Sequence, residues 1–146
     1  MIEKIGIIGN GFVGSAVAFG FGLHAEIKIY DVDPRKATHS LSEVVNSSDY
    51  IFVCVPTPME AVHGGKIDLS IIYSVFNQVS QVNERRDNIF IIKSTVIPGT
   101  MERIIAKYKN LNIVHSPEFL TERSARLEFI NASRIVLGGE DKLVNK

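Results

Sequence analysis

The stretch Lys4–Gly14, KIGIIGNGFVG, joins a short apolar run to a glycine-rich turn. The run KIGII has the length and the glycine flank of a buried strand. The residues that follow, Phe12–Leu23, are rich in Ala, Val, Phe and Gly and predict a tightly packed helix. A G-x-G-x-x-G turn between a strand and a helix is typical of a dinucleotide site. Gly9 would permit the tight turn, Gly11 would let the backbone approach a pyrophosphate, and Gly14 would let the helix pack on the strand.

An acidic residue ends the second expected strand. Glu26–Tyr30 alternates in polarity, and Asp31 follows it about 20 residues after Gly9. A carboxylate there accepts hydrogen bonds from an adenosine ribose and repels the 2′-phosphate of NADP, so the sequence predicts NAD. Arg35 leaves an alternative open, because a nearby arginine suits NADP or clamps an adenosine. A turn that binds no ligand, beside a solvated Asp31, is a further alternative.

Strand and helix patterns alternate along the rest of the chain. Apolar runs without alternation indicate strands that are buried on both faces of a parallel sheet. The further expected strands are Tyr50–Val55, Asn88–Lys93, Leu111–His115 and Arg134–Leu137, and the further expected helices are Ser40–Asn46, Asp68 or Ser70 to Asn83, Pro98–Lys109 and Phe119–Ile130. We therefore predict one α/β domain over residues 1–146, with a doubly wound, mainly parallel six-stranded Rossmann-type sheet. Asp141 would cap a further short helix.

Composition excludes several classes of protein. Among the 146 residues the 16 basic and 16 acidic side chains cancel, which leaves no basic field for nucleic acid or a membrane surface. No apolar run approaches the length of a membrane span. The single cysteine, Cys54, excludes a disulfide framework and makes the cytoplasm the expected location. Cys54 lies within an apolar run, where we expect a buried structural thiol.

The histidines give no metal site. The four residues His24, His39, His63 and His115 share no metal-ligand spacing, so we expect hydrogen-bonded or solvated roles for them. His63 stands in a glycine-flanked loop and is the one histidine that could reach a substrate.

Polar loops follow the carboxyl ends of three successive expected strands. They are VPTP (Val55–Pro58), KSTVIPGT (Lys93–Thr100) and SPEFLTE (Ser116–Glu122). Ligands of an open α/β sheet bind at that edge, so the loops predict a site there. Within the third loop Glu118 and Glu122 are four residues apart, a spacing at which like charges repel on a helix. They could handle protons in a reaction, or they could merely interact with the N-terminus of a helix.

The ordered set of motifs resembles the N-terminal domain of the UDP-glucose/GDP-mannose dehydrogenase family. The resemblance covers essentially the whole chain, and it includes GNGFVG, Asp31, the three loops, the helix entry Gly64–Ser70 and the stretch SRIVLGG at Ser133–Gly139. Members of the family oxidise the C6 alcohol of a nucleotide sugar to a carboxylate, in two hydride transfers to NAD. The resemblance thus implies a UDP- or GDP-linked sugar as substrate.

The resemblance also implies roles for individual residues. The residues that would contact NAD are Gly9, Gly11, Phe12, Val13, Gly14, Asp31, Arg35, Thr57 and Thr95. The residues implied in catalysis are Thr95, Glu118 and Glu122. The backbone of Phe119 and Leu120, together with Glu122, would meet the sugar.

Two departures from the family pattern limit these implications. Val32–Asp49 is too short for the extra helix that members usually carry there. The family's central helix and its C-terminal domain, with a nucleophilic Cys and its Lys and Asn partners, do not appear before Lys146. We therefore expect this chain alone to be inactive and to need a separate catalytic domain or an oligomeric partner. The alternatives are a non-catalytic NAD-binding module and a fragment of a 6-phosphogluconate or hydroxyacid-type dehydrogenase.

Overall fold

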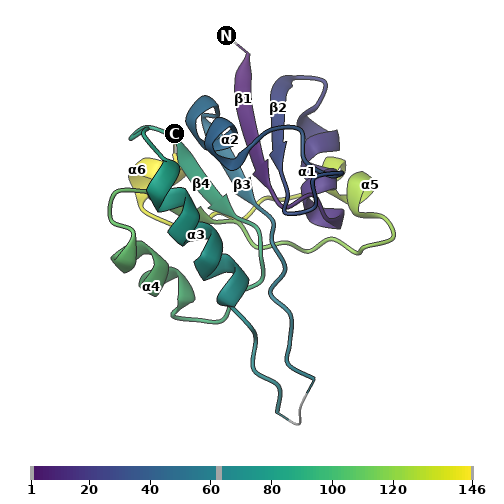
Figure 1. Ribbon diagram of the computed structural model, residues 1–146. Coiled ribbons are helices and arrows are strands. Elements are labelled where there is room, and N and C mark those ends of the chain that lie inside the picture. The colour runs from purple at the N-terminus through teal and green to yellow at the C-terminus, as the bar shows by residue number, and fades with distance from the viewer. Residues whose placement is uncertain (1, 62–63, 146) are drawn as a thin grey trace.

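A parallel sheet forms the centre of the computed structural model, which describes residues 2–61 and 64–145 (Figure 1). Its five strands lie in the order β2-β1-β3-β4-β5 and all four pairings are parallel. The strands are β1 (Glu3–Ile8), β2 (Ala25–Tyr30), β3 (Tyr50–Val53), β4 (Ile89–Ile92) and β5 (Asn112–His115). The predicted doubly wound α/β fold is therefore confirmed.

The prediction of a sixth strand was wrong. Within the described part of the chain, Arg134–Leu137 forms no strand, and only Gly138 pairs, through an antiparallel bridge to His115 with two hydrogen bonds of 2.8 Å. The side chain of Ile135 is 74% exposed, and Val136 and Leu137 are also exposed. The composition of this run is typical of a strand, but its apolar side chains are not covered by other described residues here. Strand composition without such burial does not decide pairing.

Helices cover both faces of the sheet. One face packs against α2 (Leu41–Ser47), α3 (Ser70–Val82) and α4 (Thr100–Lys107), and α3 stands in front of the sheet in Figure 1. The other face packs against α1 (Phe12–Phe21), α5 (Ala125–Ile130) and α6 (Asp141–Val144).

The middle strands are buried on both of their faces. In β3, Ile51 and Val53 enter the core under α2, α3 and α4, whereas Phe52 enters the core under α1. The ring of Phe52 lies 5.6 Å from that of Phe21. Because successive side chains of a strand point to opposite faces, an unbroken apolar run is what a covered parallel sheet requires.

A local side-chain cap explains where α2 begins, whereas α6 begins without one from a described residue. Ser40 Oγ accepts from Glu43 N at 3.3 Å and the Glu43 carboxylate accepts from Ser40 N at 2.8 Å, so the expected capping box precedes α2. The prediction that Asp141 caps the last helix was wrong, because α6 (Asp141–Val144) begins at Asp141 itself, and Glu140 at the N-cap position makes no side-chain cap to described residues.

The helix expected from Phe119 begins only at Ala125. Glu128 takes hydrogen bonds from Thr121 N at 2.6 Å, Thr121 Oγ1 at 2.7 Å and Ser124 Oγ at 2.5 Å. These bonds hold residues 121–124 as turns, so the helical pattern of this segment is overridden by a local side-chain network.

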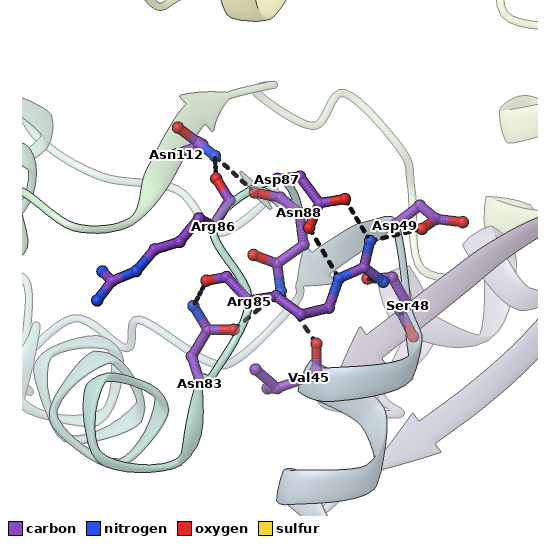
Figure 2. A network of polar contacts seen from close by, with 9 residues as sticks. All are labelled: Val45, Ser48, Asp49, Asn83, Arg85, Arg86, Asp87, Asn88 and Asn112. Carbon is purple, nitrogen blue, oxygen red and sulfur yellow. Dashed lines mark hydrogen bonds and ion pairs between the residues drawn. The ribbon is translucent and has the colours of Figure 1, made fainter.

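Arg85 ties together the loops at the amino ends of the middle strands (Figure 2). Its guanidinium donates to Asp87 at 2.9 and 2.8 Å, to Asp49 at 2.9 Å and to the carbonyl of Ser48 at 3.1 Å. The hydrogen bonds to Asp87, and after them those to Asp49, raise the pKa of Arg85. This fork joins the residues before β3 to those before β4.

Two asparagines extend the same network. Asn88, which is buried, donates through Nδ2 to the carbonyl of Val45 and to Asn83 Oδ1, both at 3.0 Å. Asn112 donates to the carbonyls of Arg86 at 2.8 Å and Asn88 at 3.0 Å, which links the start of β5 to that of β4. Figure 2 thus shows a network in which side chains satisfy the backbone at the amino edge of the sheet.

Candidate functional site

The three glycines of the first turn are required for different reasons. Gly9 has φ +94°, and a Cβ there would lie 2.8 Å from the carbonyl oxygen of Cys54. A Cβ on Gly14 would lie 1.9 Å from the carbonyl oxygen of Gly9, so helix α1 could not pack as it does. At Gly11, by contrast, no atom of a described residue other than its neighbours in the chain lies within 4 Å of that position. The fold itself does not need glycine at Gly11, but a pyrophosphate approaching the backbone there does.

Asp31 is held against this turn. Its carboxylate accepts from the backbone N–H of Asn10 at 2.7 Å and from that of Asp33 at 2.8 Å. The side chain of Asn10 in turn donates to the carbonyl of Lys36 at 2.9 Å. The acid that follows β2 therefore lies beside the glycine turn in a fixed orientation, as a ribose-binding carboxylate must.

Arg35 is paired with a different acid. Its guanidinium donates to both oxygens of Asp33, at 3.0 and 2.8 Å, and its side chain is 88% exposed. The hydrogen bond from Arg35 holds the pKa of the Asp33 carboxyl below its ordinary value. Arg35 is thus near the ribose side of the turn but is engaged within its own loop.

A cavity of about 280 Å³, here called the turn cavity, opens where four loops meet. The turn after β1 lines it, together with the loops after β3, β4 and β5. The lining residues are Gly11, Phe12, Val13, Cys54, Val55, Pro56, Thr57, Lys93, Ser94, Thr95, Glu118 and Leu120. Thr57 Oγ1 donates to the carbonyl of Thr95 at 2.7 Å and so ties two of these loops together. The predicted cofactor residues Thr57 and Thr95 line the same cavity as Glu118.

A buried ion pair forms one wall of the turn cavity. The side chain of Lys93 is 7% exposed, and its Nζ lies 3.0 Å from Glu118 Oε2 and 3.1 Å from Ser116 Oγ. Glu118 Oε1 accepts from the backbone N–H of Phe119 at 2.9 Å. Sequence reasoning missed Lys93 as a site residue, although a lysine that closes an apolar strand and precedes a polar loop was a visible signal.

Glu122 does not line the turn cavity with Thr95 and Glu118. It is exposed and lines a separate hollow of about 240 Å³ with Phe12 and Ser15. The helix-cap alternative does not describe either acid, because α5 begins after Ser124 and has no side-chain cap from a described residue.

The substrate residues expected around the sugar line a larger cavity. Phe119, which is 70% exposed, and Leu120 border a volume of about 570 Å³ between the loop after β5 and residues 128–136. Lys93 and Glu118 border it as well, so this outer cavity and the turn cavity share a wall.

Cys54 lies just after β3 and lines the turn cavity. Burial raises the pKa of its thiol to about 12, and the carboxylate of Glu118 contributes in the same direction. The thiol is therefore protonated near neutral pH. The expectation of a fully buried cysteine inside the strand was wrong, because Cys54 follows β3, is half-buried and borders the turn cavity.

The remaining expectations concern histidines, metals and membranes. Burial lowers the pKa of His115. His63 lies outside the described residues. The described residues contain no group of three or more His, Cys, Asp or Glu side chains that could hold a metal ion. None of the described helices is both long and apolar enough to cross a membrane.

Comparison with known proteins identifies the family. The sequence model of the UDP-glucose/GDP-mannose dehydrogenase family, NAD binding domain, matches residues 34–145. The chain belongs to this family. The matched part of the family is its NAD-binding domain, and NAD is the cofactor. The glycine turn and Asp31 come before the matched residues, so their roles rest on the geometry above.

Relatives and solved structures are considerably longer than this chain. The UDP-glucose 6-dehydrogenase of Rickettsia prowazekii is 37% identical over 114 residues, which are 75% of this chain and 26% of that protein. A UDP-glucose dehydrogenase from Pyrobaculum islandicum superposes with a TM-score of 0.80 at 24% identity and covers 99% of this chain and 43% of its own. A GDP-mannose dehydrogenase from Pseudomonas aeruginosa superposes with a TM-score of 0.81 at 23% identity, and the match covers 97% of this chain and 42% of that protein. The structural likeness shows the fold, and the chain spans about a quarter to two-fifths of these proteins.

Proposed function

We propose that this chain is the cofactor half of an NAD-dependent nucleotide-sugar dehydrogenase, which oxidises the C6 alcohol of a UDP- or GDP-linked sugar to a carboxylate when a second domain completes it. The observation that carries the proposal is the turn cavity, where the glycine turn meets Thr95 and the Glu118–Lys93 pair. A module that only holds NAD needs the glycine turn but has no need of a carboxylate on the same wall.

NAD, when bound, supplies the hydride acceptor. The chain's own residues would bind and orient it: the N–H groups of the first turn of α1 would donate to the pyrophosphate, and Asp31 would accept from the adenosine ribose. Thr57, Thr95, Phe12 and Val13 line the turn cavity and would contact NAD there. Asp31 favours NAD over NADP because its carboxylate repels a 2′-phosphate. Arg35, which could otherwise bind that phosphate, is paired with Asp33.

Glu118 and Thr95 are proposed to act on the alcohol. The Thr95 hydroxyl and the Glu118 carboxylate border one cavity, so they can hold a water and accept the proton that leaves the alcohol oxygen. Glu122 and the backbone of Phe119 and Leu120 are proposed to contact the sugar from the outer cavity side. Glu122 reaches that position only if residues 121–124 rearrange when substrate binds.

The carboxylate stage requires a thiolate that this chain does not offer. Cys54 is held protonated by burial, with a pKa of about 12. We therefore propose that a separate domain, or another subunit, supplies the nucleophile, and that the isolated chain binds NAD without turnover. A cytoplasmic setting fits the single cysteine of the chain.

Absorbance of NADH separates this proposal from a purely binding module. The purified chain, incubated with NAD and UDP- or GDP-sugars, is expected to form no NADH, and NADH should appear when a Cys-bearing second domain of a relative is added. Glu118→Gln should then lower the rate about a hundredfold. Sustained NADH formation by the chain alone, abolished by Cys54→Ser, would contradict the proposed half-site.

The position of Glu122 favours one second candidate. Because this acid lines a different hollow from Thr95, a non-catalytic NAD-binding module remains the competing function. If complementation with several second domains gives no NADH although NAD binds, that module is the better description.

A further inference from the structure

The Lys93–Glu118 pair separates two cavities. Both residues, with Leu120, line the turn cavity of about 280 Å³ and the outer cavity of about 570 Å³. Both side chains are largely buried, at 7% and 12% exposure. An unpaired charge at such a place would be costly, and the pair as a whole is neutral.

The partners are held by different contacts. Lys93 Nζ also donates to the buried hydroxyl of Ser116, and Glu118 Oε1 accepts from the next backbone N–H. Glu118 Oε2 accepts no well-aligned hydrogen bond from any residue that the structure describes, although it lies 3.0 Å from Nζ. The carboxylate is thus fixed in place by charge and still has an acceptor free.

Sheet order shows which end of NAD these residues would meet. Asp31, on the ribose side, follows β2, the glycine turn follows β1, and Lys93 follows β4, two strands further along the sheet. A dinucleotide that crosses the turn from Asp31 brings its nicotinamide end to the loops after β3 and β4. That end carries a positive charge in oxidised NAD and none in reduced NAD.

We propose that the Lys93–Glu118 pair, by its neutrality, keeps the affinities of the site for oxidised and reduced NAD nearly equal. The inference rests on the proposed function, which places the cofactor at the turn cavity. With both partners present the wall is neutral and gives little preference between the two forms. Loss of one partner leaves a unit charge where solvent screens it poorly, and this charge acts on oxidised NAD alone.

Charge-removing variants test the proposal in the chain as it stands, by calorimetric titration with NAD and with NADH. Glu118→Gln leaves the lysine unpaired and should weaken oxidised relative to reduced NAD by roughly fivefold to tenfold. Lys93→Met leaves the carboxylate unpaired and should shift the ratio as far in the opposite direction. The double variant Lys93→Met/Glu118→Gln should return the ratio to within about twofold of the unaltered chain.

Controls distinguish charge from damage. Lys107→Met removes a lysine from α4, away from the cavity, and should leave the ratio unchanged. If Lys93→Met fails to fold, Lys93→Gln keeps a group that can hydrogen-bond to Ser116 and should give the same shift. Folded single variants that bind both forms with an unaltered ratio would overturn the inference and leave the NAD site intact. If the unaltered chain binds neither form, the proposed function fails and the inference fails with it.

Discussion

The two ends of the parallel sheet carry polar clusters of opposite character. At the amino end, Arg85, Asn88 and Asn112 donate hydrogen bonds to neighbouring carboxylates and carbonyls, and these bonds join the starts of three strands. At the carboxyl end, Glu118 Oε2 is buried with no aligned hydrogen bond from the described residues, and it faces a cavity. Side chains that bridge several strands stabilise one conformation, even though the buried hydroxyl of Ser48 has no hydrogen-bond partner among the described residues, whereas an unpaired acceptor beside a cavity retains capacity for a ligand. Variants at the two ends should therefore separate stability from binding.

The largest expected effect on stability is at the amino end. Asn88→Ala removes two hydrogen bonds and leaves the carbonyl of Val45 and the side chain of Asn83 without this donor. We expect the free energy of unfolding to fall by about 2–4 kcal/mol, because Asn88 is buried. Denaturant unfolding measures the loss, with the exposed Asn110→Ala as control. NAD affinity, measured under conditions where the variant is folded, should be unchanged. A parallel loss of NAD affinity would contradict the separation of stability at the amino end from binding at the carboxyl end.

Cofactor preference should respond at the carboxyl end. Asp31→Ala removes the carboxylate that Asn10 and Asp33 orient and that would repel a 2′-phosphate. The unaltered chain should bind NAD at least about tenfold more tightly than NADP, and the variant should narrow that gap severalfold. Calorimetric titration of both cofactors gives the two dissociation constants. Equal or tighter binding of NADP by the unaltered chain would remove Asp31 from the role assigned to it.

The smallest expected effect is a pH dependence from His115. Burial lowers its pKa, so below the ordinary value of about 6.5 the unfolded chain takes up a proton that the folded chain does not. The stability that this histidine contributes is therefore present above about pH 6.5 and is lost below it. The free energy of unfolding should decrease by less than about 1 kcal/mol as pH falls from the ordinary pKa to the lowered pKa of the folded chain. Unfolding curves between pH 5 and 8, compared with those of His115→Gln, measure this part. A variant with the same pH dependence as the unaltered chain would mean that His115 does not contribute.

The parts that sequence predicted well are those fixed by neighbouring residues. The glycine turn, the acid after β2 and the Ser40–Glu43 capping box are each set within a few residues or by one strand-turn-helix unit. Unbroken apolar runs likewise predicted a parallel sheet, because burial on both faces leaves no room for polar alternation.

The parts that sequence did not predict depend on contacts between distant segments. Lys93 and Glu118 follow different strands, and only the pairing of β4 with β5 brings them together. Glu122 lies apart because Glu128 holds the turn before α5, which the helical pattern did not reveal. The stretch Arg134–Leu137 has the composition of a strand, yet pairing depends on what covers its side chains, and that is not encoded in the run itself.

Gly11→Val tests the central claim most directly, because the fold leaves the space around Gly11 free for a cofactor. No described atom lies where the new Cβ would be, so the variant should unfold within a few degrees of the unaltered chain, while NAD affinity falls by about a hundredfold or more. Gly14→Val is the matched control, since its Cβ would lie 1.9 Å from the carbonyl oxygen of Gly9 and should destabilise the fold itself. A folded Gly11→Val variant that binds NAD as tightly as the unaltered chain would contradict the account, because the cofactor would then not bind through this turn.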